Sequence, residues 1–163
     1  MTDSGADESL MVRALALARR AKRRGEPPFG ALVVDPDGHV VSEATDEVEG
    51  GGDFTLHAEL GAVRLACRAR GRDLSGHCLY TTVEPCPMCF TAAWLARIGR
   101  IVFGCSMAAM KKATNGAQRE LLLEAERLNA LSGEPVILEA GVLGARCLAL
   151  FGGGRDDEAG DGE

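Results

Sequence analysis

Residues 84–89 read Glu84-Pro85-Cys86-Pro87-Met88-Cys89, and they directly follow the apolar run Cys78–Val83. The run is rich in β-branched residues and predicts a strand. Residues 85–96 predict a turn that leads into a helix. Strands that alternate with helices along a chain are typical of an α/β fold, in which helices cover a sheet.

A second short segment, His57-Ala58-Glu59, lies near the start of another predicted helix, over residues 55–70. Apolar residues recur on one face of that helix, and a glycine ends it. They are Ala58, Ala62, Leu65, Ala66, Ala69 and Gly71. Both segments stand at the N-termini of helices that cover the same sheet. We therefore expect them to lie at the same edge of that sheet.

The remaining elements complete the predicted architecture. They are a helix over 10–24, a hairpin with strands at 31–34 and 39–42, strands at 101–103 and 136–139, and helices over 117–131 and 142–150. The turn signal at 35–38 supports the hairpin, and the glycine-rich stretch 46–53 predicts a loop. Strands joined through a helix should lie parallel, so we expect a three-layer α/β/α sandwich.

Length and charge fit one domain that does not grip long nucleic acid. The chain has 163 residues, a net charge of −6 and a pI of about 5.1. We expect a disordered leader over 1–9, one domain over 10–151 and a disordered acidic tail over 152–163. No apolar run approaches the ~20 residues of a membrane span. No signal-peptide pattern opens the chain, so we expect a cytoplasmic protein.

The two short segments together predict a zinc site. Imidazole nitrogen and thiolate sulfur are the usual zinc ligands, and a Cys-x-x-Cys pair at a helix start brings two thiolates to one ion. His57, Cys86 and Cys89 supply three ligands. Three protein ligands leave one position for water, which is typical of catalytic zinc. Glu59 can take a proton from that water as a general base.

Other interpretations of this pattern must be weighed. The cysteine pair alone could be a redox pair or half of a structural zinc site. The whole pattern could also belong to a non-catalytic, zinc-stabilised binding module, which would require a lost base or a filled fourth position. Glu59 is present, and the other cysteines stand singly and are interpreted as small buried hydrophobes. They are Cys67, Cys78, Cys105 and Cys147.

His-x-Glu followed by Pro-Cys-x-x-Cys is the signature of zinc deaminases, and the chain resembles the cytidine deaminase superfamily from about Leu10 to Phe151. The segments DFTLHAE (53–59), EPCPMC (84–89) and RIGRIVFG (97–104) resemble one branch. That branch holds guanine deaminase, fungal-type cytosine deaminase and bacterial tRNA adenosine deaminase. The resemblance implies a five-stranded mixed sheet, a Zn2+ cofactor held by the three ligands above, and a homodimer with its active site near the interface.

The resemblance also implies substrate contacts. The N–H of Ala58 would lie near the ring or a carbonyl group of the substrate, and Glu84 and Pro85 would line the pocket beside the zinc. The segment PPFG (27–30) resembles one wall of the base pocket. Phe29 would contact the ring there, although it fits an ordinary core position equally well, and Gly30 would let the backbone approach closely.

One departure from the branch concerns Asp46. The branch has an asparagine seven residues before the aspartate that is Asp53 here. An ionised carboxylate accepts hydrogen bonds but donates none, so Asp46 would favour a ring edge rich in N–H groups, such as an amino-azine or guanine-like face. Alternatively, the glycine-rich loop shifts the register, and Asp46 is a surface residue. Phe54 and Leu56 add bulk near the pocket mouth.

We therefore expect a zinc-dependent hydrolase that acts on carbon–nitrogen bonds of cyclic amidines. Its substrate would be a free nucleobase or a related small amino-heterocycle, from which it releases ammonia. The alternative is a tRNA-specific adenosine deaminase, because RIGRIVFG (97–104) resembles that family closely. That family typically ends in a basic helix, whereas this chain ends in acidic residues that repel phosphate. They are Asp156, Asp157, Glu158, Asp161 and Glu163.

Overall fold

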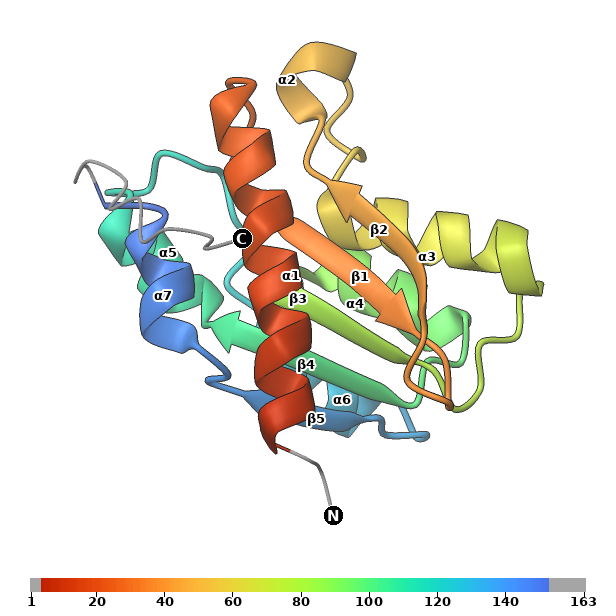
Figure 1. Ribbon diagram of the computed structural model, residues 1–163. Helices are drawn as coiled ribbons and strands as arrows, with labels where there is room; N and C mark the ends of the chain where they lie inside the picture. Colours follow the sequence, from red (N-terminus) through yellow and green to blue (C-terminus); the bar gives the residue numbers. More distant parts are fainter. Residues whose placement is uncertain (1–3, 153–163) are drawn as a thin grey trace.

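The computed structural model describes residues 4–152, and they build a five-stranded mixed sheet (Figure 1). The strands lie in the order β2-β1-β3-β4-β5. Their bounds are Gly30–Val34 (β1), Val40–Thr45 (β2), Cys78–Val83 (β3), Arg100–Cys105 (β4) and Ile137–Ala140 (β5). Strand β1 pairs antiparallel with β2 and β3, whereas the β3–β4 and β4–β5 pairs are parallel. The predicted hairpin and the predicted parallel strands are therefore both present.

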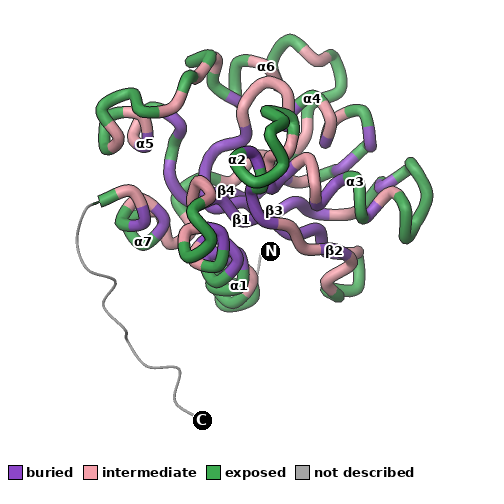
Figure 2. Tube along the Cα trace, turned by 90° about the horizontal axis from the view of Figure 1, so that it is seen from above, coloured by how far each residue is buried: buried purple, intermediate pink, exposed green. Residues whose placement is uncertain are grey.

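Helices cover both faces of this sheet. In the described part of the chain they are α1 (Ser4–Arg23), α2 (Val48–Gly51), α3 (Ala58–Arg70), α4 (Pro87–Leu95), α5 (Met107–Ala113), α6 (Ala125–Leu131) and α7 (Gly144–Ala149). Helices α1 and α7 pack on one face, and α3, α4 and α6 lie on the other (Figure 2). This is the predicted three-layer sandwich. None of the helices within residues 4–152 is long and apolar enough to cross a membrane.

The fully buried strands β1 and β3 form the part of the core that supports the site. Every residue of β1 and β3 is buried, whereas the edge strand β5 is partly exposed. Strands covered on both faces have continuous apolar runs, which explains why Cys78–Val83 lacks an alternating pattern. Segment 84–89 leaves the buried end of β3 directly. The chemistry-bearing residues are therefore attached to the most firmly packed strand.

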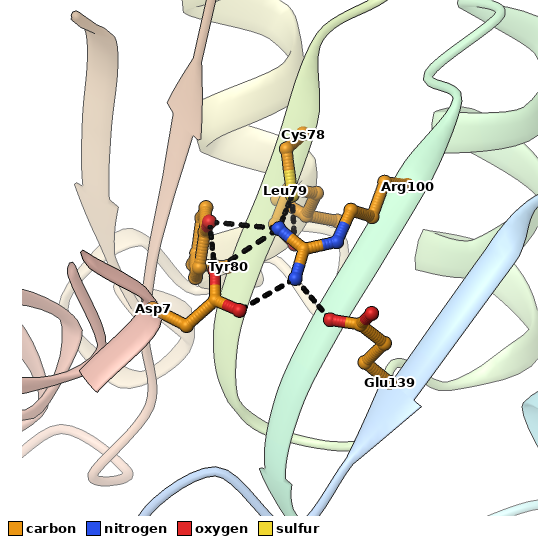
Figure 3. A network of polar contacts seen from close by, with 6 residues as sticks. All are labelled: Asp7, Cys78, Leu79, Tyr80, Arg100 and Glu139. Atoms are coloured by element: carbon orange, nitrogen blue, oxygen red, sulfur yellow. Dashed lines mark hydrogen bonds and ion pairs between the residues drawn. The ribbon is translucent and has the colours of Figure 1, made fainter. Parts of the chain in front are cut away.

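The first helix begins at Ser4, so residues 4–9 are helical and do not form the expected leader. Asp7 is buried, and Figure 3 shows its carboxylate facing Tyr80 of β3 and Arg100 of β4. The Asp7–Arg100 ion pair measures 2.6 Å, and the Tyr80 hydroxyl donates to Asp7 over 2.7 Å. Glu139 of β5 pairs with the same guanidinium. Tertiary contacts of this kind stabilise a helix end that local spacing does not predict.

The prediction of a helix over 117–131 is wrong for the first half of that range. Helix α6 covers only Ala125–Leu131, and α5 occupies residues that were not expected to be helical. Residues 114–124 between them are irregular, and Gly116 has a φ of +70° that turns the chain away from helix. Leu121 is 76% exposed whereas Ala125 is fully buried, so the apolar spacing that favoured a helix marks a buried face only within α6. The expected acidic tail, apart from Gly152, lies outside the described residues.

Candidate active site

His57, Cys86 and Cys89 meet at the N-termini of α3 and α4. His57 directly precedes α3 and Cys86 directly precedes α4, both with extended backbone, at ψ values of 149° and 166°. Neither side chain caps its own helix, so both point elsewhere. The sulfur atoms of Cys86 and Cys89 lie 3.6 and 3.5 Å from Nδ1 of His57. The structure thus brings the two segments together, as the sequence predicted.

This geometry fits a tetrahedral zinc ion. Zn–S bonds of about 2.3 Å and Zn–N bonds of about 2.0–2.1 Å place sulfur and nitrogen about 3.5 Å apart at the tetrahedral angle. The three ligand atoms all lie within 4.8 Å of one another. Among residues 4–152, the group contains these three side chains and no fourth ligand. One coordination position therefore remains for water, which is the arrangement of catalytic zinc.

The pKa values of the two thiols of the cluster are shifted in opposite directions. The pKa of Cys86 is lowered, because the Cys89 thiol donates a hydrogen bond to it and His57 lies beside it. The pKa of Cys89 is raised by that same hydrogen bond and by burial. The hydrogen bond with Cys86 raises the pKa of His57 to about 9. A bound metal must displace these protons, so its affinity should fall in acid.

Glu59 stands in the first turn of α3 with only 4% of its surface exposed. The hydroxyl of Thr81 on β3 donates to its Oε1 over 3.2 Å. Burial raises the pKa of Glu59 to about 7, and the charge of Cys86 adds to the shift. A carboxyl group with such a pKa can take up and release a proton near neutrality. Glu59 borders the same small pocket as His57 and Cys86.

A larger pocket of about 590 Å³ opens beside the metal ligands. Its volume falls in the range of small-molecule sites, about 300–1,000 Å³. His57 and Cys86 contribute to its wall. Its charged lining is mainly acidic and consists of Asp46, Glu49, Glu120 and Arg119. Pro27, Val48, Phe54, Pro87, Met88 and Leu121 supply apolar lining.

Asp46 is one of the expected substrate contacts, and the structure places it in this larger pocket. It is 3% exposed, so the alternative that it is a surface residue does not hold. Oδ1 accepts the Val48 N–H over 3.0 Å, and burial raises the pKa of the carboxyl group. Within the described residues, Oδ2 makes no hydrogen bond. One carboxylate oxygen is therefore free for a ligand.

Phe29 and Gly30 lie where α1, β1 and the smaller pocket meet. Phe29 borders that pocket and also packs against Phe151, with ring centroids 5.5 Å apart, so both of its expected roles have support. At Gly30, an added Cβ would lie 2.3 Å from the carbonyl oxygen of Ala14 in α1. The close backbone approach at Gly30 is thus made to a helix, and not to a ligand.

Ala58, Pro85 and Glu84 are all buried next to the metal ligands. Ala58 opens α3 between His57 and Glu59, whereas Pro85 lines neither of the two pockets. Glu84 borders the smaller pocket, but both of its carboxylate oxygens already accept backbone N–H groups. Its carboxylate therefore binds backbone N–H groups of the protein with both oxygens.

Sequence reasoning missed three polar residues of the site. Gln118 and Glu120 line both pockets, yet they lie in the segment that was expected to be helical. Burial raises the pKa of Glu120. The Asn115-Gly116 pair is a turn signal that could have separated this segment from a helix. Thr81 was missed because nothing in a buried strand marks which hydroxyl faces a carboxylate on a neighbouring helix.

Comparison with known proteins agrees with this geometry. Residues 4–105 match a family model described as the cytidine and deoxycytidylate deaminase zinc-binding region. The matched region extends from α1 to β4 and includes Glu59 and the three ligand residues.

Two curated relatives are named for tRNA. The chain is 47% identical over 95 residues to tRNA(Ile)-lysidine synthase of Deinococcus radiodurans, a match that covers 58% of this chain and 16% of that protein. It is 43% identical over 95 residues to the tRNA-specific adenosine deaminase of Agrobacterium fabrum, covering 58% of this chain and 62% of that one. The chain thus spans less than two thirds of either relative.

A similar solved structure contains a small purine, and no tRNA is named for it. The structure of NE0047 in complex with 2,6-diaminopurine is similar with a TM-score of 0.80 and 26% identity, and the match covers 89% of this chain and 79% of that one. The relatives therefore include proteins named for tRNA and a protein that holds a free purine.

Proposed function

This chain belongs to the cytidine and deoxycytidylate deaminase zinc-binding family, and we propose that it is a hydrolytic deaminase of a free nucleobase or a related small amino-heterocycle. One observation carries the proposal. A buried general base, Glu59, borders a small pocket with two members of a three-ligand zinc group, beside a larger pocket whose charged lining is mainly acidic. A non-catalytic module would lack that base or fill the fourth position.

Hydrolytic deamination breaks one carbon–nitrogen bond. A water oxygen adds to the ring carbon that carries the amino group, the amino group leaves as ammonia, and a ring carbonyl remains. His57, Cys86 and Cys89 would hold the zinc ion, which when bound would supply Lewis acidity and lower the pKa of water for this attack. Glu59 takes one proton from the water and delivers it to the ring nitrogen, and it then carries the second proton, from the hydroxyl group added to the ring carbon, to the departing amine. Thr81 orients the Glu59 carboxylate.

The pocket lining favours a substrate with several N–H donors and no phosphate. Asp46 offers a free carboxylate oxygen, and Glu49 and Glu120 are further acids in the same pocket. Carboxylates accept N–H groups such as those of guanine-like or amino-azine rings. They repel phosphate, and among the described lining residues of this pocket Arg119 is the one arginine or lysine. A small amino-heterocycle is the substrate class that fits.

A tRNA adenosine deaminase is the second candidate. The observation that favours it is the 43% identity to the tRNA-specific adenosine deaminase of Agrobacterium fabrum. An adenosine at the end of a loop could reach the same zinc group. The acidic pocket argues against it, because backbone phosphates beside the base would face Asp46 and Glu49.

We further propose a homodimer with the active site near the interface. Several large apolar side chains are exposed, among them Phe54 at 84% and Leu121 at 76%, and both of these line the larger pocket. Apolar side chains at the rim of a site are suited to contact a second copy. Light scattering coupled to size exclusion tests this, and a monomer at micromolar concentration would contradict it.

Ammonia release from the zinc-loaded protein tests the proposed activity. The panel contains guanine, adenine, cytosine, their nucleosides, aminated pterins and triazines, and a tRNA anticodon stem-loop. Turnover of a free base or an azine supports the proposal. Turnover of the stem-loop alone would establish the second candidate, and absence of turnover on every compound would contradict both.

A further inference from the structure

One wall of the site is built by an irregular segment, residues 114–124, which we call the strap. It joins α5 to α6, and its residues Gln118 and Glu120 border both pockets. Most of the strap is exposed. The backbone hydrogen bonds that its N–H groups make within the described chain are local, such as Ala117 N–H to Thr114. Segments of this kind have low local stability, so the place of the strap depends on its ends.

One carboxylate contacts the first residues of the helices on either side of the strap. Oε2 of Glu84 accepts the N–H of Met107, the first residue of α5, over 3.0 Å. Oε1 accepts the N–H of Ala125, the first residue of α6, over 2.8 Å. The N–H groups of a first helical turn have no partner inside the helix, and a negative charge there is favourable. Glu84 therefore stabilises the start of α6, which directly follows the strap, and the start of α5, the helix that leads into it.

Glu84 is itself fixed relative to the metal ligands. Its own N–H donates to the carbonyl oxygen of Cys105 at the end of β4 over 2.8 Å, and its side chain is only 7% exposed. Cys86 follows two residues later. The contacts that position the strap and two of the expected zinc ligands therefore come from the same short segment, residues 84–89.

We propose that Glu84 is a positioning residue that sets the pocket wall by clamping the strap, and that it does not contact the substrate. This inference rests on the proposed deaminase function, because it states that Glu84 raises the affinity of the pocket for the substrate of that reaction. With the clamp intact, Gln118 and Glu120 face the pocket before the substrate arrives. Without it, binding must order the strap, and that ordering weakens affinity.

The substitution Glu84→Gln tests the clamp with almost no change in shape. An amide offers one acceptor oxygen, and its NH2 group turns toward the other backbone N–H, so the start of either α5 or α6 is released. We expect hydrogen–deuterium exchange in peptides covering 114–124 to accelerate about tenfold. For the best panel substrate, KM should rise about tenfold while kcat stays within about threefold. Zinc content should remain at the wild-type value.

Asp73→Asn is the matched control. Asp73 also accepts a backbone N–H, that of Ser75, but it lies in neither pocket. This variant should change neither KM nor exchange in the strap. Unchanged strap exchange in Glu84→Gln, or a fall in kcat with KM unaltered, would overturn the proposal. Lost zinc would overturn it too, because Glu84 would then support the metal and not the wall.

A measurement on the wild-type protein keeps the proposal open to refutation if the variant does not fold. In the wild-type protein, the amide protons of Met107 and Ala125 should exchange more slowly than those of the strap. Fast exchange at both clamped amides would overturn the proposal. If the wild type deaminates nothing, the proposed function fails, whereas the exchange and zinc measurements still decide whether Glu84 is a clamp.

Discussion

The hydroxyl of Thr81 lies 3.2 Å from Oε1 of Glu59, and both side chains are buried. This contact joins the central strand β3 to the first turn of α3. The same hydroxyl lies 3.0 Å from the carbonyl oxygen of Val83, so its single proton serves one of two acceptors at a time. The carboxylate of Glu59 is therefore held by packing and by a hydrogen bond from Thr81, for which it competes with the carbonyl oxygen of Val83.

Glu59→Gln should abolish turnover while zinc stays bound. An amide of the same shape cannot take a proton from water, and general-base catalysis contributes about 10²–10⁴-fold. The measurement is kcat on the best panel substrate together with the zinc content of the same preparation. Activity within threefold of the wild type would contradict the role assigned to Glu59.

Thr81→Val should lower kcat about tenfold, because a mobile carboxylate is less well placed to transfer a proton. The variant keeps the size of the side chain and removes only the hydroxyl. Thr81→Ser restores the hydroxyl and should recover most of the loss. If the serine and valine variants are equally slow, the lost methyl packing is responsible, and the hydrogen bond to Glu59 is not.

The sequence predicted the elements whose signals are local. The strand Cys78–Val83, the helix starts at His57 and Cys86 and the zinc group were all found, because short spacings and continuous apolar runs mark them. Their meeting at one sheet edge followed from the strand–helix alternation alone.

The parts that were missed depend on tertiary contacts. The first turn of α1 is held by Asp7 and Arg100, which are far apart in sequence. The position of the strap depends on Glu84, and Leu121, whose spacing favoured a helix, is largely exposed. Likewise, Gly30 was assigned to ligand approach because the sequence does not show that α1 crosses over it.

Removal of the metal should destabilise the protein and expose the cysteine pair. The ion links the N-termini of α3 and α4, and a ligand at about 1,000 times its Kd stabilises a fold by about 4 kcal/mol. We expect a chelator to lower Tm and zinc to restore it. Cys89→Ser should lose the metal, whereas Cys67→Ser, at a partly exposed position outside the ligand group, should keep it. Equal zinc content in both variants would exclude this site as the metal centre.

Asp46→Asn should change which substrate is preferred. In the proposed complex the free oxygen of Asp46 would accept an N–H from the ring edge, and the amide of the variant would present a donor there instead. We expect kcat/KM to fall about tenfold for guanine or 2,6-diaminopurine and to fall less for rings without that N–H. Glu49→Gln changes another acidic residue of the same pocket and is the control. An unchanged kcat/KM across the panel would show that Asp46 does not contact the ring.

The ion pair of Asp7 should make folding stability depend on pH in acid. The hydrogen bond from Arg100 lowers the pKa of Asp7 below its ordinary value, despite an opposing effect of burial. A carboxyl group with a depressed folded-state pKa contributes stability that is complete above the unfolded value of about 3.9. That contribution is lost as the pH falls through the lower folded-state pKa.

Asp7→Asn should therefore be less stable than the wild type near pH 7 by about 2 kcal/mol, the size of a hydrogen bond to a charged group. The gap should narrow as the pH drops from about 4 toward 2, because the wild-type carboxyl group becomes neutral as well. Urea unfolding at several pH values measures it. Glu8→Gln removes an exposed acid from the same helix turn and should show no such trend. A gap that stays constant down to pH 2 would mean that Asp7 acts through packing, and that its charge contributes nothing to holding α1 on the sheet.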